Sequence, residues 1–103
     1  MIANKVFNAG AVKEGDEITY TFKGNASPSI TEIKVKLGCS CTSINSLPAT
    51  AKDKEGNYTI SVDGDFSLVG TVNTRGGKTG KKKKMITITE PETIKLFIEY
   101  EIR

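Results

Sequence analysis

Histidine is absent from this 103-residue chain, and only two cysteines, Cys39 and Cys41, occur in it. Without histidine the chain lacks the commonest general base, the side chain that titrates near physiological pH and the usual transition-metal ligand. Because a single residue separates the two cysteines, they cannot build a disulfide framework that holds a fold together. These absences count against an enzyme, so we expect no catalytic residues and no cofactor, and the hydrophobic core must stabilise the fold.

Long apolar segments are also missing. No window approaches the roughly 18 apolar residues of a membrane span, and residues 1–7 lack the hydrophobic region and the small-residue cleavage site of a signal peptide. We therefore expect synthesis in the cytoplasm without export and no membrane contact; removal of a leader would make the periplasm the alternative. The length and composition, 37% hydrophobic and 26% charged, fit one globular domain over residues 1–103.

Apolar and polar residues alternate with a period of two through much of the chain, and no stretch has sustained helical periodicity. The alternation predicts strands over 18–23, 32–37, 58–63, 86–89 and 94–103, and shorter strands near 5–7 and 69–73. Turn-forming residues lie between them at the spacing of a small immunoglobulin-like domain. The sequence thus predicts an all-β, immunoglobulin-like β-sandwich of about seven antiparallel strands. Phe97, on the polar side of the last strand, is a candidate partner contact.

Acidic residues are missing between Phe66 and Thr89, where six of the 15 basic residues gather. The other nine basic residues stand against 12 acidic ones, so the net charge of +3 is local to this segment. We expect the segment to form a basic, Gly/Lys-rich hairpin at about 74–84. The candidate residues for binding a partner or a polyanion are Arg75, Lys78, Lys81, Lys82, Lys83 and Lys84.

Three interpretations of this basic segment remain open: an acidic protein surface as partner, a nucleic acid as partner, or plain solvation of a loop. No aromatic residues lie between the basic ones to stack on bases, which makes nucleic acid the least favoured partner. Lysines beside a strand also guard that strand against pairing with a neighbouring chain.

Several short motifs resemble one known family. They are the turn Lys13-Glu14-Gly15, the segment Cys39-Ser40-Cys41-Thr42, Pro48 and the strand entry at 56–60. Their order is similar to that of uncharacterised bacterial immunoglobulin-like domains with a Cys-Gly-Cys-Thr signature, which are related to the ASH and major-sperm-protein sandwiches; Ser40 stands in place of the signature glycine. The resemblance implies the sandwich fold and an adhesive or scaffolding role without established catalytic residues.

Three further motifs are weaker candidates. The spacing of Cys39 and Cys41 would suit Cu(I), yet two ligands are few for a metal site, and structural thiols are the preferred interpretation. The segment 76–79 matches the end of a phosphate-binding loop, but Val72 stands where that motif requires glycine. A last group of carboxylates lacks the spacing of a calcium loop and favours turns; it comprises Asp53, Glu55, Asp63 and Asp65.

The combined prediction is a non-enzymatic structural or interaction protein. Small immunoglobulin-like domains without a leader are familiar as accessory subunits on phage particles. The leading hypothesis is therefore a virion protein, a capsid decoration subunit that docks on a major capsid or other coat protein or self-associates. The alternatives are a soluble or exported bacterial adaptor module and, third, a copper or redox carrier that uses Cys39 and Cys41.

Overall fold

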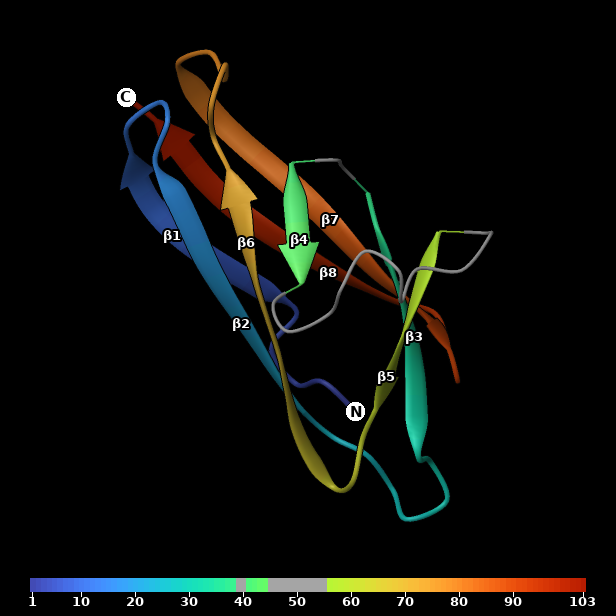
Figure 1. Cartoon of the computed structure of the whole chain (residues 1–103). Coiled ribbons are helices and arrows are strands. Elements are labelled where there is room, and N and C mark those ends of the chain that lie inside the picture. The colour runs from blue at the N-terminus through green and yellow to red at the C-terminus, as the bar shows by residue number, and fades with distance from the viewer. Residues whose placement is uncertain (39–40, 45–55) are drawn as a thin grey trace.

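Two β-sheets pack face to face to form a sandwich (Figure 1). The computed structural model describes residues 1–38, 41–44 and 56–103. Its strands are β1 (Val6–Val12), β2 (Glu17–Asn25), β3 (Glu32–Leu37), β4 (Thr42–Ile44), β5 (Asn57–Ser61), β6 (Asp65–Asn73), β7 (Gly80–Glu90) and β8 (Ile94–Ile102). The large sheet has the strand order β1-β8-β7-β3-β5 and the small sheet the order β2-β6-β4. The predicted all-β sandwich is confirmed.

The described strands differ from the prediction in number and in one direction. There are eight of them, because β4 was not expected; a strand of three residues is too short for alternation to reveal it. β1 runs parallel to β8, so the sheets are not wholly antiparallel. Alternation reports which face of a strand is buried but carries no information on the direction of its neighbour. Among the described residues, no helix is long and apolar enough to span a membrane.

The expected hairpin at 74–84 is not a hairpin. β6 belongs to the small sheet and β7 to the large one, so residues 74–79 cross from one sheet to the other. Lys81 to Lys84 lie within the first half of β7 rather than in a loop. A turn between two strands of one sheet and a crossing between two sheets use similar glycine-rich sequences, which explains the error.

The core lies between the sheets and contains the apolar residues that the alternation placed on one side of each strand. From the large sheet, β8 contributes its whole inward row, Ile94, Leu96, Ile98, Tyr100 and Ile102. From the small sheet, Tyr20 and Phe22 of β2 are buried, and their rings lie 5.8 Å apart between centroids. Each fully buried large apolar side chain contributes about 1.5–3 kcal/mol, so these rows supply most of the stability.

The small sheet is held by a contact that spans all three of its strands. Tyr20 of β2 lies opposite Gly70 of β6, and its hydroxyl donates a hydrogen bond of 2.7 Å to the Ser43 carbonyl of β4. The ring therefore passes over Gly70, where a β-carbon would collide with the Tyr20 hydroxyl and the Ser43 carbonyl oxygen. Glycine is required here by the close approach of its neighbours, not by its backbone angles.

Replacing Gly70 with alanine should lower the free energy of unfolding by about 3 kcal/mol, because overpacking displaces the tyrosine and breaks its hydrogen bond. Urea unfolding followed by circular dichroism measures the change. Ser67→Ala is the matched control, since Ser67 is exposed on the other face of the same strand, and its effect should stay within about 0.5 kcal/mol. Equal stability of the two variants would contradict this account of the small sheet.

Tyr20 should also make the stability depend on alkaline pH. Burial raises the pKa of Tyr20 above its ordinary value of 10.0, so in alkali the unfolded chain loses this proton before the folded one. This contribution is fully present below pH about 10 and is lost as the pH rises further. Tyr20→Phe should cost about 1–2 kcal/mol at neutral pH and should lose less stability than the parent between pH about 9 and about 11. Parallel pH curves for the two proteins would overturn the assignment.

Candidate protein-interaction surface

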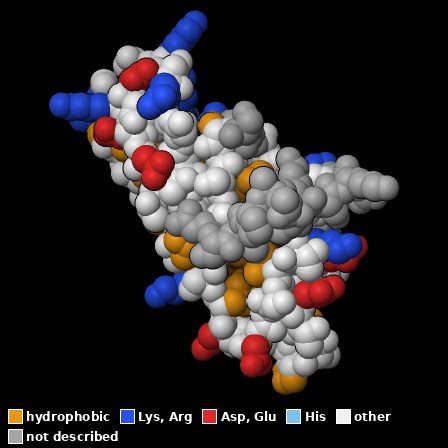
Figure 2. All heavy atoms as spheres, viewed as in Figure 1, with side chains coloured by type: hydrophobic (Ala, Val, Ile, Leu, Met, Phe, Trp, Pro, Cys, Tyr) orange, Lys and Arg blue, Asp and Glu red, His pale blue; other side chains and the backbone are white. Residues whose placement is uncertain are grey.

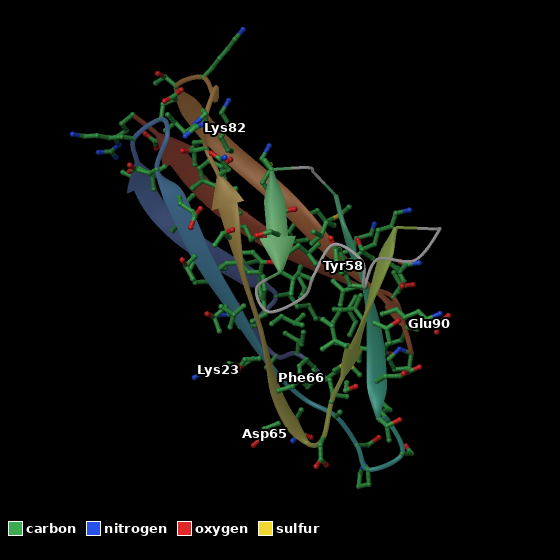
Figure 3. The ribbon with its side chains drawn as sticks, in the orientation of Figure 1. Lys23, Tyr58, Asp65, Phe66, Lys82 and Glu90 are labelled. Carbon is green, nitrogen blue, oxygen red and sulfur yellow. The ribbon has the colours of Figure 1, made fainter. Side chains whose placement is uncertain are left out.

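The six predicted basic residues do not form one patch. Arg75 and Lys78 are exposed in the crossing between β6 and β7, whereas the four lysines alternate along β7. Lys81 and Lys83 are exposed on the outer face of the large sheet, the face turned away from the small sheet. Lys82 and Lys84 are half-buried and share the inward side with the buried Ile86, because strand side chains alternate. Figure 3 shows Lys82 near the tip of the molecule and Glu90 at the opposite end of β7.

On the outer face, the lysines of β7 meet acidic partners. Lys81 lies opposite Glu101 and Lys83 opposite Glu99 on β8. The Lys83 Nζ is 3.8 Å from the Glu99 Oε1 and 4.5 Å from the centroid of the Phe97 ring. A shallow groove runs over these pairs toward Asn8 of β1. The outer side of the basic segment is therefore close to electrically neutral and offers little to an acidic partner.

On the inward side, the lysines of β7 face uncharged residues. Lys82 lies opposite Tyr100 and Lys84 opposite Ile98. Neither lysine takes part in the ion pairs found among residues 1–38, 41–44 and 56–103. Each is half-buried, and the β8 residues opposite them carry no acid that would neutralise their charge.

The first half of β7 also lies at the edge of the large sheet. β7 pairs with β8 from Gly80 to Ile88 but with β3 only in its second half, and in Figure 1 it extends well past the end of β3. The outermost backbone contact on the β3 side is the hydrogen bond of 3.1 Å that Gly38 N–H donates to the Met85 carbonyl. Beyond it, no described strand lies beside Lys81 to Lys84.

The direction of the backbone groups along this edge follows from alternation. The Met85 carbonyl points toward β3, so the backbone groups of Lys83 and Lys81, two and four residues away, point to the same side. Phe97, opposite Met85, donates its N–H to the Lys5 carbonyl on the β1 side and not to β7, which agrees with this assignment. The described residues make no hydrogen bond to these outward-pointing groups of Lys81 and Lys83.

A row of apolar side chains that the sequence did not predict crosses the outer face next to the Lys83–Glu99 pair. Val6 of β1, Phe97 of β8 and Met85 of β7 lie side by side in register. Val6 and Met85 are the large hydrophobic residues that are most exposed in the described chain, at 42% and 38%. Phe97 is the candidate partner contact on β8; because β8 lies between β1 and β7, Phe97 can meet a partner on the face of the sheet but not at an edge. Alternation in the sequence places Met85 and Phe97 on the polar side of their strands, but it does not show that the two residues are neighbours.

The crossing between the sheets is fastened to the turn between β1 and β2. Thr74 donates its hydroxyl to the Asp16 carbonyl at 2.6 Å, and the Gly76 N–H binds the Glu14 carboxylate at 2.9 Å. The glycine amide that a phosphate-binding loop would offer is thus already occupied by an internal anion. Figure 2 shows basic and acidic side chains interspersed at this end of the molecule rather than a uniformly basic tip.

The weaker candidates gain no further support. Cys41 is half-buried and disulfide-bonded, so the interpretation of this residue as a structural thiol is wrong. Because a thiolate is the metal-binding form, reduction would have to precede metal binding. Cys39, Asp53 and Glu55 lie outside the described residues, so the proposed copper or redox site stays a prediction. Within the described residues, no group of three or more cysteine or acidic side chains is placed to hold a metal. Asp65 accepts a hydrogen bond of 2.6 Å from the Asn25 side chain and closes the strand pair β2–β6.

The outer-face ion pair should contribute little. In a double-mutant cycle with Lys83→Met and Glu99→Gln, we expect a coupling below about 1 kcal/mol, as for other exposed pairs. The coupling should shrink further in 1 M salt, where charges are screened within about 3 Å. Urea unfolding of the four proteins gives the value. A coupling energy well above this limit would mean that the Lys83–Glu99 ion pair contributes substantially to the stability of the fold.

Comparison with known proteins bears on the fold. The chain matches no known protein-family model and no curated protein. Among solved structures, the chain is similar to the ASH/PapD-like domain of human CEP192 (PapD-like domain 7). The two are 13% identical with a TM-score of 0.60, and the match covers 100% of this chain and 84% of that one. The chain therefore has the fold of the ASH and PapD-like β-sandwiches, a variant of the immunoglobulin-like fold.

Proposed function

We propose that this protein is a non-enzymatic interaction module that docks on a larger protein assembly through the first half of β7. The observation that carries the proposal is the half-buried pair Lys82 and Lys84, which lies at a sheet edge that no described strand covers and faces no acidic residue on β8. A fold by itself does not determine function, so the proposal rests on this site and not on the structural neighbour. The partner surface must be acidic to match these lysines.

The finer expectations are part of the same proposal. We propose that the assembly is a phage virion, with this chain as an accessory subunit on its coat, and that the chain is a divergent bacterial immunoglobulin-like domain in which Ser40 replaces the signature glycine. Support for the first is the analogy with small domains on phage particles, and support for the second is the Cys39-Ser40-Cys41-Thr42 segment. A bacterial adaptor remains the alternative.

Charge reversal at the inward lysines tests the docking element. The double variant Lys82→Glu and Lys84→Glu should weaken attachment to the native assembly about tenfold or more, and the parent should detach progressively as salt is raised. Lys5→Glu with Lys23→Glu is the matched control, because it changes the net charge equally at two exposed lysines elsewhere. Cosedimentation measures attachment. Attachment that survives reversal at Lys82 and Lys84 would rule out this docking element.

The identity of the assembly needs a separate measurement. Quantitative mass spectrometry of purified particles from the native source should find the chain at a fixed ratio to a major coat protein. If the chain is instead recovered soluble or with a few partners, the virion hypothesis fails and the adaptor hypothesis leads.

A further inference from the structure

We propose that the partner docks by strand addition: an extended acidic segment pairs with the open edge of β7 at Lys81 to Lys84 and continues the large sheet. The inference rests on the proposed function and specifies how the same site binds. Its ligand is an extended peptide segment with acidic side chains at alternate positions.

The edge offers the backbone groups that strand addition requires. The N–H and C=O groups of Lys81 and Lys83 point away from β8, and the described chain makes no hydrogen bond to them there. An added strand would lie in line with β3, which pairs with the same edge of β7 from Ile86 to Glu90. Main-chain hydrogen bonds then supply affinity, and the side chains at alternate positions supply specificity.

Charge determines which strand can bind. Lysines along an edge repel ordinary strands, since pairing would bring their ammonium groups against apolar or basic neighbours. An acidic strand would instead be attracted, because its carboxylates would lie beside the ammonium groups. On the outer face its side chains would meet Lys81 and Lys83, which already lie opposite Glu101 and Glu99. On the inward face they would meet Lys82 and Lys84, which lie opposite Tyr100 and Ile98.

The strand should therefore carry its acids on the inward side only. Side chains of one face recur at every second position of a strand, so the partner segment has acidic residues two apart, separated by neutral residues. A segment with the same composition but with its acids in one block would place half of them on the outer face, beside lysines that already lie opposite acids. Alternation in the ligand is thus a specific consequence of the alternation in β7.

A synthetic peptide of about eight residues, an ordinary strand length, with alternating Glu and Thr tests this directly on the unaltered protein. Its binding is compared by fluorescence anisotropy with that of a peptide with the Glu residues in one block and with two peptides N-methylated at alternate positions. N-methylation removes a backbone donor without changing charge. We expect the blocked peptide and one N-methylated set to bind about tenfold or more weakly, and the other N-methylated set to bind as the parent peptide does.

That asymmetry arises because only every second N–H of an added strand points at β7. Loss of binding in both N-methylated sets, or in neither, would overturn strand addition, and so would failure of the alternating peptide to bind. If charge reversal at Lys82 and Lys84 still abolishes attachment to the assembly in that case, the docking function stands and only its mode is wrong.

A protein variant provides an independent check. Lys81→Pro removes the side-chain charge and the outward N–H, whereas Lys81→Ala removes only the charge. Because the Lys81 N–H points away from β8, proline should leave the β7–β8 ladder intact. We expect the proline variant to bind the alternating peptide about tenfold more weakly than the alanine variant, with similar urea midpoints. Equal binding by the two variants would contradict the proposal.

Discussion

The Tyr20 hydroxyl that reaches across Gly70 to the Ser43 carbonyl is the contact on which the small sheet depends. β4 has three residues, and among the described strands its only partner is β6; so short a ladder holds a strand weakly. The tyrosine ties it to β2 as well, two strands away. With β4 held in place, the small sheet covers the apolar row of β8 and protects the core of the larger sheet. The Tyr20 side chain and the absence of a β-carbon at Gly70 therefore together hold β4 in the small sheet.

The candidate docking edge results from unequal strand lengths. β7 has 11 residues and β3 has six, so β7 extends beyond the strand that covers its edge. Such an extension is a liability, since unpaired backbone groups invite other strands, and a run of lysines is a common protection against it. Under the proposed strand addition, the same lysines would also make the edge selective, because they would disfavour neutral and basic strands and attract acidic ones. On that proposal, the lysines at 81–84 would serve both to protect the edge and to recognise a partner.

The sequence predicted the core better than it predicted the site. The inward row of β8 and the strands β2 and β3 followed from alternation, because burial of one strand face is a local property. Extending the alternation of Ile86 and Ile88 back through the lysines would also have placed Lys82 and Lys84 on the inward face and Lys81 and Lys83 on the outer face. The open edge could not be foreseen, since it depends on where β3 ends relative to β7. The grouping of Val6, Phe97 and Met85 likewise depends on β1 joining β8, strands from distant parts of the chain.

The position of β8 has a consequence for how the chain acquires its structure. It is the last of the described strands in sequence, yet it lies between β1 and β7 and is hydrogen-bonded to both. During synthesis the five-stranded sheet cannot form until the residues up to Ile102 have left the ribosome, and until then β1 and one side of β7 lack the neighbour that they have among the described strands. Long-range pairing of this kind slows folding and prolongs the exposure of apolar strands.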